Sequence, residues 1–181
     1  IMSTTFLNFT CDKCSFQGDS LVTFGGFYWA HKEKTFQIDQ QLGLCSDCDE
    51  IIAMEKLPDS FTMKRAREIR KDYTGQPLFQ LTEKDYAKYL ASQEGFAVLD
   101  RVIALKRRPV CLKCGGNTVQ AIELPSNAGG SIPIKIGIKH PKCSGNLKVH
   151  GSDGVRLGMN PIKYIYDIYG KLTSTVEGYD D

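Results

Sequence analysis

The sequence predicts an α+β fold in which two small metal-stabilised β modules are joined by a helical hairpin. Four pairs of candidate metal ligands with two-residue gaps carry this prediction, three of them Cys-x-x-Cys and one His-x-x-Cys. Strand-like runs accompany the pairs near both ends, whereas apolar residues between them recur with a helical period. A chain of 181 residues is long enough for one ordinary domain or two small ones.

Residues 2–57 form the predicted N-terminal module. The run TTFLNFT is a short strand entering Cys11 and Cys14, and SLVTFGGFYWA followed by HKEK and TFQI has the pattern of an aromatic-rich hairpin. Cys45 and Cys48 come next, followed by the apolar run EIIAMEKL. A segment this short rarely supports a core of its own, so we expect it to depend on a bound ion.

Residues 58–108 are expected to form two or three helices packed as a hairpin. In PDSFTMKRAREIRKDYTGQP, Asp and Ser are N-cap candidates ahead of apolar residues at helical spacing, and Gly and Pro end the pattern. The run LTEKDYAKYLASQEGFAVLDRVIALKRRP starts with a capping-box-like Thr82 and Asp85. Its apolar residues again have a helical period, and Gly95 can divide it.

Residues 109–181 return to a strand pattern, which defines the predicted C-terminal module. Cys111 and Cys114 lead into NTVQAIEL, and isoleucines alternate with other residues over positions 132–138. This alternation predicts a strand with one apolar face that ends at His140. Two more hairpins are expected in NLKVHGSDGVRLGM and YIYDIYGKLTSTV, each turning at a glycine-containing loop.

Seven cysteines and His140 supply eight candidate ligands, which is two sets of four. An odd number of cysteines, with nothing that points to an oxidising compartment, argues against a disulfide framework. Tetrahedral zinc takes four nitrogen or sulfur ligands, and a two-residue gap lets one tight turn present two of them. We therefore expect two structural Zn²⁺ ions. A redox dithiol or a set of buried thiols is the alternative.

These turns resemble the knuckles of the zinc-ribbon superfamily, in which two knuckles at the tips of β-hairpins grip one ion. The resemblance covers both ends of the chain and leaves the helical middle unmatched. It implies a four-cysteine site in an N-terminal ribbon and a site of three cysteines and one histidine in a C-terminal ribbon. The implied ligands are Cys11, Cys14, Cys45 and Cys48 for the first site, and Cys111, Cys114, His140 and Cys143 for the second.

Glycine positions distinguish the two sites, and loop lengths favour one pairing of the knuckles. Gly115 and Gly145 suit the positive φ that tight ligand turns require, so the second site matches the family pattern better. Sequential pairing of the knuckles is expected because it closes short loops. An interleaved cross-brace would close larger loops across the helical segment, at an entropic cost only about 1 kcal/mol higher.

No catalytic residue is predicted. A closed four-ligand site leaves no coordination position for water, so neither ion is expected to activate a nucleophile. His31 lies in a turn-like run, and His150 is too close in sequence to Ser152 and Asp153 to form a nucleophile triad. The paired glycines lack the lysine and the strand-to-helix context of a phosphate loop. We therefore expect a protein that is not an enzyme.

Charge offers limited support for a nucleic-acid partner. Seven thiolates subtract seven charges and two divalent ions add four, which takes the formal net charge from +2 to −1. The basic excess falls on the first predicted helix, where it could give salt-dependent binding to nucleic acid. Acidic residues are interleaved with the basic ones, and a solvated helical face is the commoner explanation of such a pattern. The basic residues concerned are Lys64, Arg65, Arg67, Arg70 and Lys71.

Aromatic residues favour a protein partner. Phe27, Tyr28 and Trp29 lie in a module that is too small to bury many large rings, and aromatic residues are enriched at interface hot spots. The alternative is that these rings form the ribbon's own core. We predict a non-catalytic zinc-binding adaptor that binds another protein through ribbon and helical surfaces, with nucleic-acid binding as the alternative. No apolar run of membrane-spanning length or signal-like start is present, so a cytoplasmic protein without a membrane partner is expected.

Overall fold

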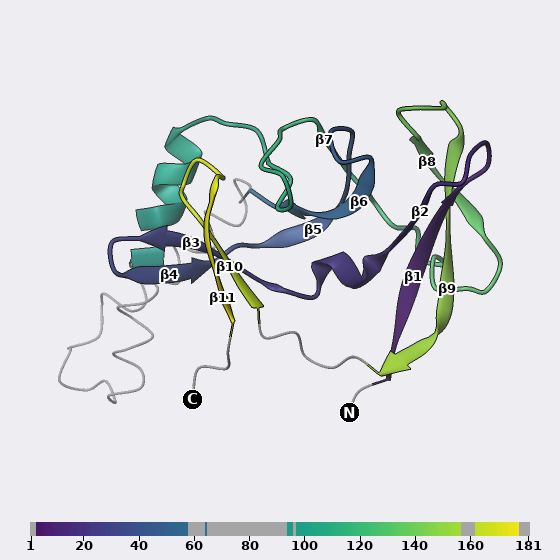
Figure 1. Cartoon of the computed structure of the whole chain (residues 1–181), viewed down its shortest axis with the longest axis horizontal. Helices are drawn as coiled ribbons and strands as arrows, with labels where there is room; N and C mark the ends of the chain where they lie inside the picture. The colour runs from purple at the N-terminus through teal and green to yellow at the C-terminus, as the bar shows by residue number, and fades with distance from the viewer. Residues whose placement is uncertain (1–2, 58–63, 65–93, 96, 157–161, 178–181) are drawn as a thin grey trace.

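The computed structural model describes residues 3–57, 64, 94–95, 97–156 and 162–177 (Figure 1). Within this part of the chain, eleven strands form three sheets. The strand orders are β2-β1-β9-β8, β11-β10-β3-β4 and β6-β5-β7. Each sheet combines strands from residues 3–57 with strands from residues 119–177. The two ends of the chain therefore fold together.

The first sheet joins the start of the chain to its last third. Strand β1 (Ser3–Cys11) pairs antiparallel with β2 (Gln17–Asp19) and, over most of its length, with β9 (Asn146–Arg156). Strand β8 (Ile134–Lys139) pairs with the other edge of β9. Phe9 lies opposite Val149, and the side chains of Phe9, Leu147 and Val149 are fully buried. This sheet therefore contributes one apolar face to the core.

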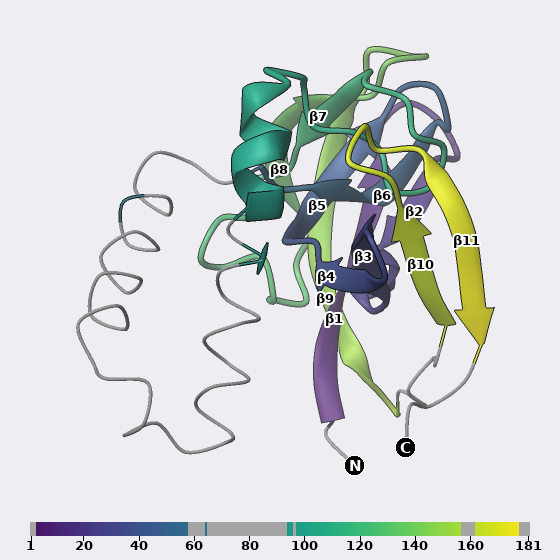
Figure 2. The same ribbon diagram turned by 90° about the vertical axis from the view of Figure 1, so that its left-hand side faces the viewer.

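The second sheet also combines strands from both ends of the chain. Strand β3 (Gly26–His31) pairs antiparallel with β4 (Lys34–Gln37) and parallel with β10 (Ile162–Tyr166). Strand β11 (Leu172–Glu177) pairs antiparallel with β10. The helix that ends at residue 104 packs its Val98 and Val102 against the same core cluster as Trp29 and Tyr166. Figure 2 shows this helix standing beside the strands.

The third sheet carries two of the knuckles. Strands β5 (Gln40–Cys45) and β6 (Glu50–Glu55) form a hairpin, and β7 (Val119–Ala121) pairs with β5. The chain around Cys111 runs along the outer edge of β6. There the N–H of Leu112 donates to the carbonyl of Ala53 at 3.0 Å, and that of Glu55 donates to the carbonyl of Val110 at 3.0 Å. This edge of β6 is thereby joined to the loop that holds the third knuckle.

A buried ion pair anchors the segment that follows the helix. Glu55 is fully buried and receives a two-pronged contact from the Arg107 guanidinium, with Nη2 2.6 Å from Oε1. Trp29 Nε1 donates to the same carboxylate at 3.2 Å, and Arg107 Nε donates to the carbonyl of Ile168 at 3.0 Å. The charges are therefore paired and hydrogen-bonded, as burial requires.

The predicted α+β fold is wrong. The described chain is mainly β, with three sheets, and does not divide into two ribbons joined by a helical hairpin. The buried residues form three clusters, each of which combines residues from both ends of the chain, so neither end buries its apolar residues alone. Most of the expected helical region, residues 58–63, 65–93 and 96, lies outside the described residues. In the described chain, no helix is long and apolar enough to cross a membrane.

Candidate metal centres

The structure gathers all eight predicted ligands into two clusters, but in a nested order. In each cluster the four ligand atoms all lie within 4.8 Å of one another. The outer site joins the first knuckle to the fourth, and the inner site joins the second to the third. The expected sequential pairing is therefore wrong. The outer site contains Cys11, Cys14, His140 and Cys143, and the inner site contains Cys45, Cys48, Cys111 and Cys114.

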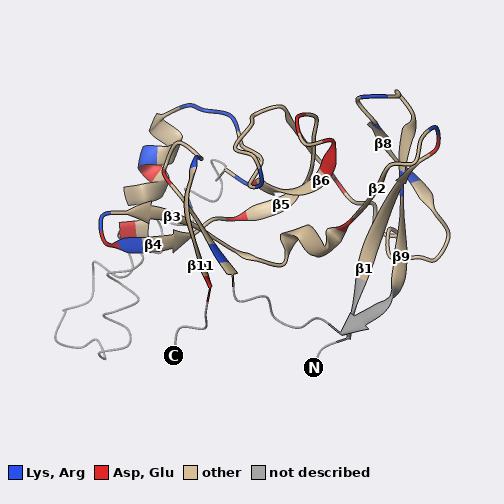
Figure 3. Ribbon diagram, in the orientation of Figure 1, with Lys and Arg blue, Asp and Glu red and all other residues tan. Residues whose placement is uncertain are grey.

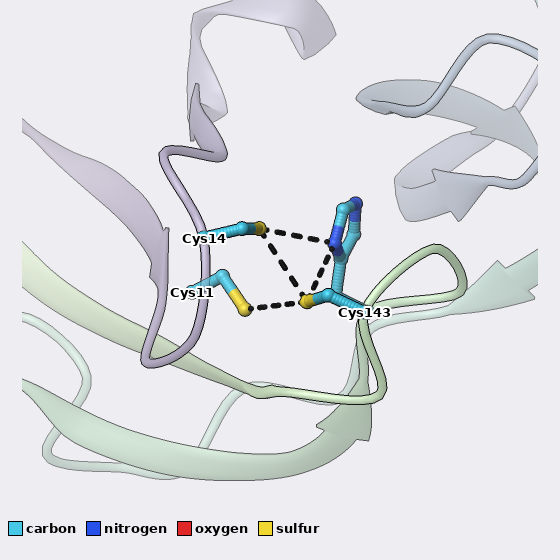
Figure 4. A group of neighbouring side chains, drawn as sticks. Cys11, Cys14 and Cys143 are labelled. Carbon is cyan, nitrogen blue, oxygen red and sulfur yellow. Dashed lines mark hydrogen bonds between the residues drawn. The ribbon is translucent and has the colours of Figure 1, made fainter.

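Strand pairing in the first sheet creates the outer site. Cys11 ends β1, and the β8–β9 turn carries His140 and Cys143, so the pairing of β1 with β9 brings both knuckles to one end of the sheet. Figure 4 shows the sulfurs of Cys11, Cys14 and Cys143 turned toward one another. The Cys11 and Cys143 sulfurs are 3.4 Å apart, and His140 Nδ1 lies 3.3 Å from Cys143 Sγ and 3.4 Å from Cys14 Sγ.

The inner site lies where the β5–β6 hairpin meets the loop beside it. Cys45 ends β5, Cys48 lies in the turn before β6, and Cys111 forms a bridge to Met54 of β6. The Cys45 and Cys114 sulfurs are 3.8 Å apart, and those of Cys48 and Cys111 are 3.9 Å apart. Cys45 and Cys111 are fully buried. Cys48 is half-buried and Cys114 is exposed, so the site lies at the edge of the protein interior.

The distances between ligand atoms fit a tetrahedral ion. A metal–sulfur bond of ~2.3 Å in a tetrahedron separates two sulfurs by about 3.8 Å, and a metal–nitrogen bond of ~2.0 Å gives a slightly shorter sulfur–nitrogen separation. In the inner site the sulfur–sulfur separations of 3.8 and 3.9 Å match this geometry. In the outer site the sulfur–nitrogen separations of 3.3 and 3.4 Å are close to it, and the sulfur–sulfur separations of 3.4 Å are shorter. A disulfide would bring two sulfurs to ~2.05 Å, and all seven cysteines are free.

Backbone N–H groups point at the sulfurs in both sites. Such bonds stabilise a thiolate, which is the form that binds metal. In the outer site the donors are Lys13 to Cys11 at 3.5 Å and Gly145 to Cys143 at 3.4 Å. In the inner site they are Cys48 to Cys45 at 3.4 Å, Lys113 to Cys111 at 3.4 Å, Cys114 to Cys111 at 3.5 Å and Gly116 to Cys114 at 3.4 Å.

Three knuckles place the residue after their second ligand at positive φ. The angles are 57° at Asp49, 75° at Gly115 and 55° at Ser144. The expectation for Gly115 is confirmed, whereas Ser144 adopts the conformation expected of Gly145. Gly145 instead allows a close approach, because a Cβ there would lie 2.4 Å from Cys11 Sγ. Glycine at this position therefore leaves space for a ligand.

The pKa values of the ligand thiols depend on burial, on neighbouring thiols and on backbone hydrogen bonds. Burial raises the pKa of Cys111 to about 12. Although the Gly145 N–H lowers it, burial and the neighbouring thiols of Cys11 and Cys14 raise the pKa of Cys143 to about 11. Burial and the neighbouring thiols likewise raise the pKa of Cys48. Although burial acts against it, hydrogen bonds from backbone N–H groups lower the pKa values of Cys11 and Cys114. Deprotonation of every cysteine would place three thiolates in the outer site and four in the inner site, and a metal ion would offset their repulsion.

His140 is held from the side that faces away from the outer site. Its imidazole is 3 % exposed, and the Phe16 ring packs against it with centroids 4.5 Å apart. Asp49 Oδ1 lies 2.7 Å from Nε2, and Lys142 Nζ lies 2.8 Å from Asp49 Oδ2. The hydrogen bond from the Lys142 ammonium and, to a smaller extent, the contact with His140 hold the pKa of the Asp49 carboxyl below its usual range. Nε2 therefore carries the proton and donates to Asp49, which leaves Nδ1 for a metal.

Sequence reasoning missed Asp49 as a site residue. The only local signal was that Asp49 stands where a tight knuckle often has glycine. Its partner His140 is 91 positions away in the chain, so the contact depends on the nested pairing. Aspartate tolerates positive φ better than most side chains, so this carboxylate fits the turn.

The aromatic residues predicted to bind a partner lie mainly in the core. Phe27 is 7 % and Trp29 1 % exposed, and both belong to the cluster that includes Tyr166. Tyr28 is half-buried. The alternative interpretation, that these rings form a core, therefore holds for Phe27 and Trp29. Phe27 and Trp29 are buried because β10 and the helix supply packing partners that residues 2–57 lack on their own.

Of the predicted basic helix, only Lys64 is described. It is helical and exposed. Arg65, Arg67, Arg70 and Lys71 lie outside the described residues.

Comparisons with protein-family models, curated proteins and solved structures found no match to this chain. The knuckle pairs are compatible with metal sites of the zinc-ribbon kind, although no match assigns the chain to that superfamily. Function is therefore inferred from the two sites and the surfaces around them.

Proposed function

We propose that the chain is a non-catalytic zinc-binding adaptor, in which two structural Zn²⁺ ions support a surface that binds another protein. The observation that carries the proposal is the gathering of eight sulfur and nitrogen ligand atoms into two groups of four. Zinc suits this set because it favours four-coordinate sites of thiolate and imidazole. Four protein ligands leave no open position for water, so each ion would stabilise structure and not take part in catalysis.

The ions would hold together parts of the chain that are far apart in sequence. The outer ion would tie the β1–β2 turn to the β8–β9 turn, and the inner ion would tie the β5–β6 turn to the loop at residues 111–114. Structural zinc contributes roughly 10–16 kcal/mol of apparent binding free energy at neutral pH in small modules. A contribution of this size decides whether such a fold forms.

An apolar cavity supports the protein-binding part of the proposal. Its volume is about 360 Å³, and Phe24 at its rim is 51 % exposed. Leu172, the first residue of β11, also lines it and is 41 % exposed. The ion pair between Lys113 and Glu50 borders the cavity. Such a hollow suits an apolar side chain from a partner.

Strand β11 offers a means of docking beside this cavity. All six of its residues are exposed, and it pairs only with β10 among the described strands. Exposed edge strands usually carry Lys, Pro or a bulge that discourages pairing. LTSTVE contains no Lys or Pro, and the irregularity in its pairing with β10 falls between Leu172 and Ser174, which leaves the register regular from Ser174 to Glu177. The partner is therefore proposed to be a protein that adds an extended segment to β11 and places an apolar side chain next to Leu172.

Photo-crosslinking followed by reconstitution tests this proposal. A photo-reactive residue in place of Ser174 should capture a partner, which is then purified and bound directly to this chain. Thr175→Lys should weaken that binding by at least about tenfold, because it charges the free edge. Thr35→Lys is the matched control, since Thr35 is also an exposed threonine in the edge strand at the opposite side of the same sheet. Equal effects of the two substitutions, or no direct binding, would refute the proposal.

Nucleic-acid binding is the second candidate function. One observation favours it: Lys135 of β8 lies directly opposite Lys148 of β9, and a phosphate would add to the Asp12 carboxylate in offsetting the repulsion between these like charges. Against it, basic and acidic residues are interspersed over the described ribbon (Figure 3). Binding to duplex and single-stranded probes should be titrated with salt, because phosphate contacts give a steep salt dependence. Absence of binding near physiological salt would exclude this candidate.

A further inference from the structure

The side chain of Asp49 links the two sites. Asp49 directly follows Cys48, a ligand of the inner site, yet its carboxylate contacts the knuckle of the outer site twice. Oδ1 accepts from His140 Nε2 at 2.7 Å, and Oδ2 lies 2.8 Å from Lys142 Nζ. The inner knuckle thus supports a ligand of the outer site.

These contacts determine which imidazole nitrogen is available to a metal. His140 Nδ1 faces the sulfurs of Cys14 and Cys143, and Nε2 faces Asp49. A carboxylate that accepts the Nε2 proton fixes the tautomer and the ring orientation and makes the ligating nitrogen a better donor. Without it, the imidazole would be free to carry its proton on Nδ1.

The position of Asp49 depends in turn on the inner site. Its backbone has φ 57°, a conformation that a non-glycine residue adopts at a cost and keeps only where the surrounding turn enforces it. Cys48, immediately before it, would be fixed by the inner ion together with Cys45, Cys111 and Cys114. An ion in the inner site would therefore hold the carboxylate where His140 needs it.

We propose that Asp49 is a positioning residue for the outer site and that it couples metal loading of the two sites. This inference rests on the proposed metal binding. An inner ion raises the affinity of the outer site, and by thermodynamic reciprocity an outer ion raises that of the inner site by the same factor.

Cobalt titration tests the coupling directly, because the visible spectrum of Co²⁺ distinguishes a four-thiolate site from one with an imidazole ligand. Asp49→Gly removes the carboxylate and tolerates the positive φ. Ser144→Gly is the matched control, because Ser144 holds the equivalent position after Cys143 with φ 55°. Asp49→Asn is the conservative variant, since its amide oxygen can still accept the proton of Nε2. His140→Cys supplies a ligand that needs no such partner, and Cys114→Ser disables the inner site.

The expected results are specific to the outer site. Asp49→Gly should lower its cobalt affinity by about 10–100-fold, and Ser144→Gly should change it far less. Asp49→Asn should restore much of the loss. Cys114→Ser should lower outer-site affinity by about 5–150-fold when Asp49 is present and much less when Asp49 is Gly. In the His140→Cys background, Asp49→Gly should have little effect on the outer site.

Three outcomes would overturn the coupling: unchanged outer-site affinity in Asp49→Gly, an equal loss of inner-site affinity measured while the outer site is empty, or the same loss of outer-site affinity in the His140→Cys background. If the unsubstituted chain binds two ions and one of these outcomes is found, the coupling fails and the proposed metal binding stands. If the unsubstituted chain binds fewer than two ions, both fail.

Discussion

Cys11 Sγ and Cys143 Sγ lie 3.4 Å apart although 132 positions separate these residues in the chain. This contact closes a loop that contains the whole inner site, so the two candidate metal centres are nested. The same arrangement brings β1 beside β9 and β3 beside β10. Metal binding at the outer site would therefore stabilise the pairing between the two ends of the described chain.

Removal of the ions is expected to unfold the protein. Loss of roughly 10 kcal/mol or more of binding free energy would match or exceed the 5–15 kcal/mol by which typical domains are stable. Trp29 is the only tryptophan and is 1 % exposed, so its fluorescence reports on the core. Excess chelator at neutral pH should shift the emission to the red, and added Zn²⁺ should reverse the shift. Unchanged emission and Tm in a metal-free sample would contradict this expectation.

Gly145→Ala should weaken the outer site alone. A Cβ at this position would lie 2.4 Å from Cys11 Sγ and 2.9 Å from Lys13 Cβ, so the ligand would have to move. We expect outer-site metal affinity to fall by at least about tenfold, a loss at the scale of changes around a metal ligand. Competition with a chromophoric chelator measures this loss. Gly129→Ala is the control, because nothing lies within 4 Å of the added Cβ, and equal effects at the two glycines would argue against a steric cause.

The buried pair of Arg107 and Glu55 should matter more to stability than the exposed pair of Lys113 and Glu50. Glu55 is fully buried, so Arg107→Met leaves an unpaired buried carboxylate and should cost about 3–5 kcal/mol. Lys113→Met removes a pair whose side chains are 58 % and 48 % exposed, and should cost at most about 1 kcal/mol. Urea unfolding of the metal-loaded protein compares the two.

A double substitution separates the energy of the Arg107–Glu55 pair from the cost of leaving one charge alone. Arg107→Met combined with Glu55→Gln should recover part of the stability lost in the single variant, because no unpaired charge remains buried. Trp29 Nε1 keeps an acceptor in the Gln side chain, so this hydrogen bond survives. A double variant less stable than Arg107→Met would contradict this explanation.

Local patterns predicted several strands correctly. Alternating isoleucines predicted a strand ahead of His140, and β8 covers Ile134–Lys139 with Ile138 buried. The expected hairpin in YIYDIYGKLTSTV is confirmed as β10 and β11, with the Gly170 N–H donating to the carbonyl of Asp167 at 3.0 Å. These features follow from residue periodicity and turn chemistry, which act over a few residues.

Contacts between distant segments were not predictable in the same way. A hairpin was expected at Ser152–Gly154, but β9 continues from Asn146 to Arg156 because β1 pairs along it, and the expected turn is only a shift of register between Ser152 and Val155. The knuckle pairing was mispredicted for a related reason. Loop-closure entropy favours sequential pairing over pairing across the middle of the chain by only about 1 kcal/mol. Burial of Phe9, Leu147 and Val149, which requires β1 to pair with β9, contributes several kcal/mol, at about 1.5–3 kcal/mol for each side chain.

Cadmium substitution provides the most direct test of the nested arrangement. With ¹¹³Cd in both sites, scalar couplings connect each cadmium resonance to the β-protons of the cysteines that bind it. We expect one resonance to couple to Cys11, Cys14 and Cys143, and the other to Cys45, Cys48, Cys111 and Cys114. A single resonance that couples to Cys11, Cys14, Cys45 and Cys48 would contradict the nested pairing.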